Sequence, residues 1–415
     1  MNDRPTVSNS TDATIRPRRL VSLDAFRGAT MLLMASEIMH VPKTLKQLDG
    51  YAGSPALQTV VHKLEHLPWA GCTLWDMIQP SFMFMVGVAL PFSLASRLAR
   101  GQSVAWMFLH ALWRSLALVA LGIFLRSVGR GMTNFTFEDV LTQIGLGYPF
   151  LFALGFARPR WQWAAAGLIL VGYWTAFAAY PEPGPQFDYP AVGVDANWPD
   201  HYEGFASHWN KNSNYAAYVD KWFLNRFPRE QPFAYNGGGY LTLSFVPSLA
   251  TMIFGLLAGG VLRGERPPRE KVAILVAAGV AGVLLGLALD WTGVCPMVKR
   301  IWTPSWALHS SGWAAIALAA FYATIDWGGW RRWAFPLVVV GMNSIAMYVL
   351  VHLSFHFTSG SLQTHLNNVA EYWLDCPVFE MFGEQYAPIV EGGAVLAIFW
   401  LISLWMYRRG VFLRV

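Results

Sequence analysis

Residues 62 to 93 read HKLEHLPWAGCTLWDMIQPSFMFMVGVALPFS, and this stretch decides the fold. A loop that contains His66 leads into an apolar helix that begins near Asp76. A histidine titrates near neutrality and can take a proton from an attacking amine or hydroxyl. A carboxylate at a membrane boundary is costly unless it has a partner or a task. His66 and Asp76 are therefore the first candidates for chemistry; the alternative is a solvated interfacial histidine and an Asp76 that caps the helix.

Apolar runs of this kind recur along the 415 residues, of which 54% are hydrophobic and only 13% are charged. About 20 apolar residues are needed for a helix to cross a bilayer. We therefore predict an all-α polytopic membrane protein with about ten transmembrane helices, over 21–41, 76–96, 104–127, 139–157, 161–180, 240–262, 272–290, 305–325, 334–356 and 389–407. Residues 1–19 have no apolar core and predict a disordered cytoplasmic tail rather than a signal peptide. Residues 20–415 are expected to form a single transmembrane domain.

Most basic residues fall in short loops on one side of the predicted membrane. Short loops rich in Lys and Arg remain in the cytoplasm, so the N- and C-termini are predicted to be cytoplasmic. The net charge of +5 thus indicates topology and predicts no nucleic-acid partner. The basic clusters that set this orientation are Arg16/Arg18/Arg19, Arg97/Arg100, Arg158/Arg160, Arg263/Arg266/Arg269/Lys271, Arg331/Arg332 and Arg408/Arg409/Arg414.

In this orientation two long segments, 42–75 and 181–239, are external loops. The second is rich in aromatic and amide side chains, such as Trp198, Trp209 and Asn210. A loop of this length usually has a function, and flat aromatic faces with amides suit a sugar. The same residues are also typical of a structured cap held by interfacial Trp and Tyr. Composition alone leaves both interpretations open.

Two smaller patterns carry structural expectations. Asp24 and Arg27 stand three residues apart within the first span and are expected to neutralise each other. Cys72, Cys295 and Cys376 all fall on the predicted external side, where a disulfide between two of them is chemically allowed. Three cysteines without metal-type spacing are more often small packing residues, and no metal site is expected.

Nine motifs follow one another along the chain: RLVSLDAFRG (19–28), HLPWAGCTLWD (66–76), PSFMFMVGVALPFS (80–93), WRSLAL (113–118), VLTQIGLGY (140–148), PSLATMIFGLLAG (247–259), KRIWTPSWAL (299–308), GMNSIAMYVLVH (341–352) and the terminal YRRGVFLRV. In these motifs the chain resembles the transmembrane acetyltransferases related to heparan-α-glucosaminide N-acetyltransferase, particularly their shorter bacterial relatives. The sequence departs from the family pattern at Glu37 to His40, where relatives often have Asn, and at Thr142-Gln143, where they have Gln-Arg.

The resemblance implies an acyltransferase of the bacterial inner membrane. It would move an acetyl group from cytoplasmic acetyl-CoA to an amine or hydroxyl of a sugar on the periplasmic side. His66 would be the catalytic base or the acyl carrier, and Asp76 is the best candidate to orient it, with Glu37 and Glu65 behind. His40 is a second catalytic candidate, because another group of membrane O-acyltransferases carries an active histidine near the end of a similar first helix.

Cofactor contacts are assigned by charge and position. CoA phosphates require cations or helix N-termini, for which Arg27, Arg114 and Arg126 are candidates. Near the apolar–polar boundary, the candidates for contacts with the donor or the oxyanion are Lys299, Trp302 and Asn343. A structural role is equally open for each of these three residues.

The alternative function is a secondary transporter of a sugar or amino sugar, with intramembrane acids and histidines as proton relays. Inverted repeats and paired broken helices would favour a transporter, and the sequence has neither. A membrane protein with a purely structural role would leave the intramembrane polar residues poorly explained. The sequence does not identify the acceptor, choose N- over O-acetylation, or set the oligomeric state, and a homodimer is among the options.

Overall fold

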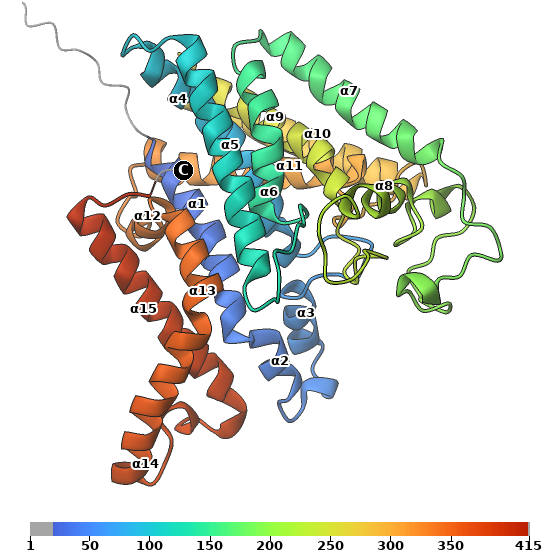
Figure 1. Cartoon of the computed structure of the whole chain (residues 1–415). Helices are drawn as coiled ribbons and strands as arrows, with labels where there is room; N and C mark the ends of the chain where they lie inside the picture. Colours follow the sequence, from blue (N-terminus) through green and yellow to red (C-terminus); the bar gives the residue numbers. More distant parts are fainter. Residues whose placement is uncertain (1–19, 414–415) are drawn as a thin grey trace, which may run out of the picture.

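The fold is that of a computed structural model, which describes residues 20–413. The predicted tail, 1–19, and Arg414 lie outside the described residues. The described part is built of helices and contains no strand, only one isolated bridge between Ala70 and Val298. The predicted all-α class is therefore confirmed. In chain order the helices are α1 (Val21–Ala35), α2 (Val41–Lys46), α3 (Pro55–Lys63), α4 (Ile78–Leu98), α5 (Val104–Ser127), α6 (Val140–Leu154), α7 (Pro159–Ala178), α8 (Tyr215–Leu224), α9 (Phe245–Arg263), α10 (Pro268–Trp291), α11 (Pro304–Phe321), α12 (Phe335–Gly341), α13 (Ser344–Leu362), α14 (Asn368–Leu374) and α15 (Ala387–Arg409) (Figure 1).

All ten segments predicted to span the membrane form helices. By length and composition, seven helical stretches among the described residues are able to cross a bilayer. They contain α4, α5, α9, α10, α11, α13 and α15. The other three predicted spans differ: α1 ends at Ala35, α6 is a shorter apolar helix, and α7 is not among the seven. The chain is thus an integral membrane protein.

The segment 334–356, predicted as one helix, is two. α12 ends at Gly341, and α13 begins at Ser344. Between them the side chain of Asn343 donates to the carbonyl of Val411 and accepts from the N–H of Leu413, both at 3.1 Å. Asn343 therefore ties the C-terminal tail to the break between the two helices.

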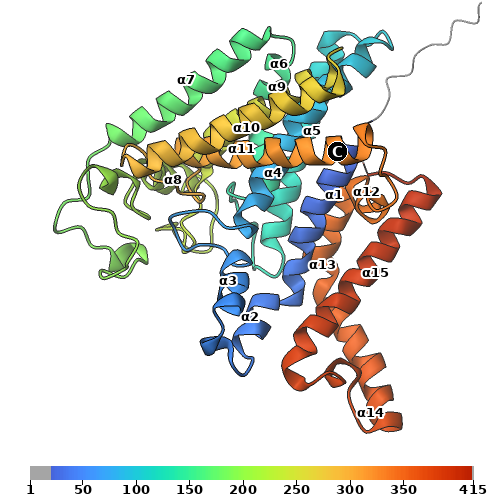
Figure 2. The same cartoon turned by 180° about the vertical axis from the view of Figure 1, so that it is seen from behind.

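The start of α1 and the C-terminal end of the described chain lie at the same end of the bundle (Figures 1 and 2). We call this end the terminal side. The opposite end, the loop side, carries the segments 36–77 and 179–244. Both described ends of the chain thus lie on one side, in accord with the charge pattern. The compartment that this side faces remains a prediction.

Small residues let the central helices approach closely. A Cβ atom added at Gly255 of α9 would lie 2.0 Å from the carbonyl oxygen of Phe84 in α4. One turn away, a Cβ at Gly259 would lie 2.4 Å from the carbonyl oxygen of Val88. Helices in a membrane associate through such close packing, because lipid offers no hydrophobic gain for their contact. α4 and α9 therefore form the rigid centre on which the loop-side segments are built.

The loop-side segment 179–244 folds over the bundle as a cap. Its buried amides bond to its own backbone: Asn210 accepts from the N–H of Tyr202 at 2.7 Å and donates to the same residue's carbonyl at 2.9 Å. Asn212 donates to the carbonyls of Val192 and Asn236. The side chain of Trp209 is fully buried. These side chains hold the cap together. For the amides, this favours a structural role over sugar binding.

A buried carboxyl group holds the end of the cap that leads into α9. Asp220 of α8 accepts a hydrogen bond from the N–H of Thr242 at 2.9 Å. Burial raises the pKa of Asp220 from 3.8 to about 7, although the bond to Thr242 opposes this shift. The attachment of the cap is therefore linked to pH near neutrality.

Candidate active site

The two residues singled out by the sequence are in direct contact. His66 lies in the loop after α3, and Asp76 lies in the 3₁₀ turn Trp75–Met77 that begins the span of α4. Nδ1 of His66 is 2.9 Å from Oδ1 of Asp76. The side chain of Asp76 is 2% exposed, whereas that of His66 is 34% exposed. The carboxylate is thus enclosed, and the imidazole reaches the surface of the loop side.

Local bonds fix the carboxylate of Asp76. Its Oδ2 accepts from the N–H of Thr73 at 3.2 Å and from the hydroxyl of Thr73 at 2.9 Å. The same hydroxyl lies 2.8 Å from the carbonyl of Glu65. A carboxylate that accepts several hydrogen bonds is stabilised in its charged form and held in one orientation. Thr73 therefore aligns Asp76 with His66.

A third charged residue completes the cluster. Nζ of Lys299 lies 3.0 Å from Oδ1 of Asp76 and 3.1 Å from Nδ1 of His66, and its side chain is 8% exposed. The bridge between Ala70 and Val298, together with the bond from the N–H of Gly71 to the carbonyl of Met297 at 2.9 Å, brings it there. Lys299, predicted as a donor or oxyanion contact, belongs to the same cluster as His66.

Two contacts at Nδ1 bear on the tautomer of the His66 imidazole. The Lys299 ammonium already neutralises the Asp76 carboxylate, so the pair does not require a charged His66. An imidazole with its N–H at Nδ1 donates to the Asp76 carboxylate, whereas one with its N–H at Nε2 accepts at Nδ1 from the Lys299 ammonium. In the first of these tautomers, Nε2 carries the lone pair and is able to accept a proton or attack a carbonyl carbon.

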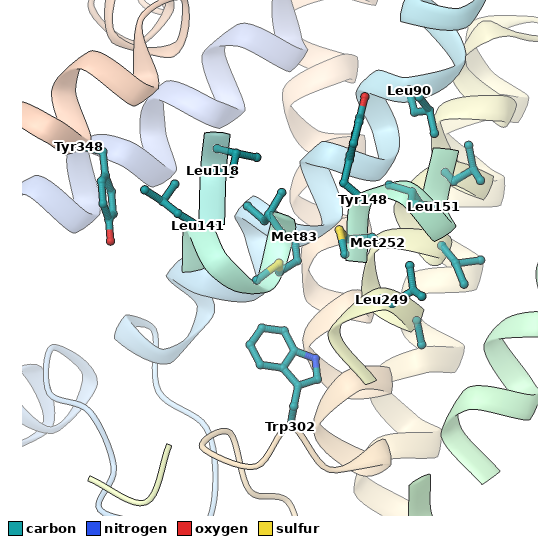
Figure 3. Close-up of a cluster of buried hydrophobic side chains, with 14 of the residues drawn as sticks. Met83, Leu90, Leu118, Leu141, Tyr148, Leu151, Leu249, Met252, Trp302 and Tyr348 are labelled. Carbon is teal, nitrogen blue, oxygen red and sulfur yellow. The ribbon is translucent and has the colours of Figure 1, made fainter. Parts of the chain in front are cut away.

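The turn that carries Lys299 is held by its neighbours. Trp302 has a left-handed backbone with φ of 49°, an uncommon conformation for a bulky residue. Its N–H donates to the carbonyl of Lys299 at 2.9 Å, and its buried indole donates to the hydroxyl of Thr251 at 3.1 Å. Figure 3 shows this indole pointing toward Met83 and Met252 in the core. Trp302 therefore positions Lys299, and it lines neither of the two cavities described below.

Arg300 connects the cluster to the cap. Its guanidinium donates to the carbonyl of Gly238 at the end of the cap and to the carbonyl of Leu67 at 3.1 Å. It also lies over the ring of Tyr240, 5.0 Å from the centroid. No pattern in the sequence singled out this residue, although it stands beside Lys299 in the KRIWTPSWAL motif. Arg300 thus connects the His66 loop to the cap, through the carbonyls of Leu67 and Gly238.

A cavity of about 600 Å³ opens toward the terminal side. Two predicted cofactor residues line it, Arg27 and Arg114, and three further basic residues join them, Arg97, Arg100 and His110. Arg27 lies 3.6 Å from Asp24, which confirms the expected pair. Arg114 donates to the hydroxyl of Tyr148 at 3.0 Å. Arg126 does not line this cavity.

The inner end of the cavity approaches the His66 cluster along α4. Phe82, which lines the cavity, is six residues from Asp76, or about 9 Å of helical rise. Between them, Gln79 donates to Gln143 at 3.1 Å, and Ile144 beside Gln143 lines the cavity. Along α4, the cationic cavity therefore reaches within about two helical turns of the His66 cluster.

The remaining predicted residues lie elsewhere. The side chain of Glu65 forms an ion pair with Lys46 at 2.7 Å, and that of Glu37 is exposed, so neither side chain supports Asp76. His40 is exposed in a left-handed turn before α2, and among residues 20–413 no carboxylate is bonded to its ring. Asn343 is buried against the C-terminal tail as described above.

The cysteines form no disulfide among the described residues. Cys72, Cys295 and Cys376 are all free thiols. Burial raises the pKa of Cys72 to about 12 and that of Cys295 to about 11. A thiol that remains protonated near neutrality is a poor nucleophile. Cys72, although next to the His66 cluster, is therefore not a competing nucleophile.

Comparison with known proteins confirms the resemblance carried by the motifs. No family model matches the chain. Heparan-alpha-glucosaminide N-acetyltransferase of Homo sapiens is 25% identical over a 378-residue alignment, which covers 80% of this chain and 52% of that protein. The protein of the same name from Mus musculus is 24% identical, with 80% and 53% covered. The chain thus spans about half the length of the curated relatives it matches.

Proposed function

We propose that this protein transfers an acetyl group from acetyl-CoA to an amine or hydroxyl of a sugar across a membrane. The observation that carries the proposal is the contact of His66 with Asp76 and Lys299. The curated relatives supply the reaction class, because both are named N-acetyltransferases that act on a glucosaminide.

In the proposed reaction, the acceptor's nitrogen or oxygen attacks the carbonyl carbon of the thioester. Nε2 of His66 removes the acceptor's proton while Asp76 stabilises the resulting imidazolium. The new C–N or C–O bond forms as the C–S bond breaks, and the proton passes from His66 to the departing CoA thiolate. If Nε2 of His66 instead attacks first, the C–S bond breaks, the CoA thiolate leaves and an acetyl-imidazole forms; the acceptor then attacks it, the C–Nε2 bond breaks, and the acceptor's proton passes to the thiolate. Both routes need an unprotonated Nε2.

The donor would enter from the terminal side, which the charge pattern assigns to the cytoplasm. The basic cavity residues Arg27, Arg97, Arg100 and Arg114 would bind the phosphates of CoA, since charge-assisted bonds from arginine suit phosphate oxygens. The pantetheine arm would then extend past Phe82 toward the His66 cluster. Half of a hydrocarbon core is roughly 15 Å, which such an arm is able to span.

The acceptor would approach His66 from the loop side, which is the periplasmic side if the protein belongs to a bacterial inner membrane. The half-exposed imidazole lies at this surface, beneath the cap that Arg300 fastens to the His66 loop. The sugar would therefore not have to cross the bilayer.

The test is acetyl-CoA consumption by purified protein in detergent, with glucosamine as the acceptor and no ion gradient. His66→Ala is expected to lower turnover by about 100- to 10,000-fold, because the base or acyl carrier is lost. His40→Ala is the matched control and should retain normal turnover. Loss of activity in the His40 variant with retention in the His66 variant would assign catalysis to His40.

A second measurement separates the proposal from transport. The protein is reconstituted in sealed vesicles, with acetyl-CoA confined to the terminal side and the amino sugar to the loop side. Acetylated product on the loop side is expected. Uptake of unmodified amino sugar without thioester cleavage would favour a transporter, and product only when both substrates share one side would refute transfer through the bundle.

A further inference from the structure

A second cavity, of about 530 Å³, forms a groove on the flank of the bundle between α1, α4 and α11. The three helices contact one another pairwise, and Figure 2 shows α11 running across the other two. The walls of the groove are mainly apolar and include Phe26, Leu33, Ile78, Ala314, Ala317 and Phe321. This groove is separate from the basic cavity, since the two share no lining residue.

The groove lies within the hydrophobic part of the molecule. α4 and α11 both belong to the stretches able to cross a bilayer. Trp313 on its rim is 46% exposed, so the groove is open at the flank rather than sealed by protein. Only a few polar side chains line the groove, among them Thr30, Ser81 and His309, so most hydroxyls of a sugar or nucleotide placed here would lack partners, at a cost of several kcal/mol each in hydrocarbon. The chemistry of the walls therefore selects a hydrocarbon chain.

One end of the groove reaches the His66 cluster. Cys72 and Thr73 line its loop-side end. The hydroxyl of Thr73 lies 2.9 Å from Oδ2 of Asp76, whose other oxygen contacts His66. A molecule with its chain in the groove would therefore have its polar end beside the proposed catalytic residues.

We propose that the groove holds the hydrocarbon chain of a lipid-linked acceptor, so that its sugar headgroup meets His66 from the membrane. This inference rests on the proposed acetyl transfer and names the class of acceptor. The chain anchors the substrate, and Thr73 marks the boundary between the anchoring part and the reacting part. A soluble sugar would use the same catalytic residues without this anchor.

The test compares two probes that share one headgroup, methyl glucosaminide and dodecyl glucosaminide, in phosphatidylcholine nanodiscs with acetyl-CoA. Ala317→Trp places a large side chain in the groove wall, whereas Ala320→Trp adds the same side chain to an exposed position of α11 outside the groove. We expect Ala317→Trp to lower kcat/KM for the dodecyl probe by about tenfold, the effect typical of a reshaped apolar pocket. The methyl probe in either variant, and the dodecyl probe in Ala320→Trp, should behave as in the wild type.

The outcomes separate the two proposals. Acetylation of both probes with equal losses in the two variants would overturn the groove proposal and leave acetyl transfer intact. If neither probe is acetylated by the wild-type protein, the proposed transfer fails.

A second measurement uses no variant, so it tests the proposal even if Ala317→Trp does not fold. Dodecyl glucosaminide with a diazirine at the end of its chain is photolysed with the wild-type protein. Labelling of α1, α4 and α11 that excess dodecyl glucosaminide removes, but methyl glucosaminide does not, supports the groove. Labelling spread over the exposed faces of α5 and α10 would show bulk lipid only and overturn the proposal.

Discussion

Removing the positive charge of Lys299 is expected to destabilise the protein and stop catalysis together. In Lys299→Met the Asp76 carboxylate, whose side chain is 2% exposed, loses its permanent counter-charge. Breaking one partner of a buried ion pair typically costs about 3–5 kcal/mol. His66 remains 2.9 Å from the carboxylate and can be protonated to replace the lost charge, so we expect a cost of about 3 kcal/mol. An imidazole that is protonated at rest cannot act as a base.

The double variant tests whether the charge is the cause. Asp76→Asn alone leaves the ammonium of Lys299, whose side chain is 8% exposed, without its partner. Asp76→Asn combined with Lys299→Met removes both charges. The combined loss of stability should then be smaller than the sum of the two single losses by about 1–3 kcal/mol. Activity should not return in the double variant, because an amide does not stabilise the imidazolium of His66.

Stability is measured as the thermal midpoint and the denaturation free energy in detergent, for the four proteins of the cycle. Turnover of acetyl-CoA with glucosamine is measured on the same samples. Strictly additive losses would mean that Lys299 and Asp76 do not interact as an ion pair. Normal turnover in Lys299→Met would remove this lysine from the proposed mechanism.

Three further predictions concern the cavity, the cap and the orientation. Arg114→Gln should raise the Kd for acetyl-CoA by about tenfold, since a charge-assisted bond to phosphate is worth about 1.5–3 kcal/mol; isothermal titration checks this, and an equal effect of Arg126→Gln would contradict the cavity as the donor site. The raised pKa of Asp220 makes the folded state bind a proton that the unfolded state has lost, so this residue's contribution to stability falls as pH rises from about 4 to about 7; Asp220→Asn should flatten that fall in the thermal midpoint, and an unchanged slope would refute the assignment. Glu203→Cys should react with an impermeant thiol reagent from outside intact cells and Arg266→Cys should not, in a background in which the three native cysteines are serine; the reverse pattern would invert the predicted topology.

The sequence by itself determined the helical class, the positions of most helices and the pairing of His66 with Asp76. Apolar runs are local, and a helix satisfies its own backbone hydrogen bonds in lipid, so composition is enough to predict it. His66 and Asp76 are also close in sequence, and one loop brings them together. The Asp24 and Arg27 pair was predictable for the same reason, since residues three apart on a helix share a face.

Only the tertiary structure decided the place of Lys299. It is 223 residues from Asp76 along the chain, and it reaches the carboxylate because the segment 297–299 pairs with the loop around Ala70. No local pattern records that pairing. The break at Asn343 likewise depends on the C-terminal tail, to which its side chain bonds. The basic cavity and the apolar groove arise where helices distant in sequence pack side by side, and the shape of such spaces is a property of packing, which periodicity and composition do not encode.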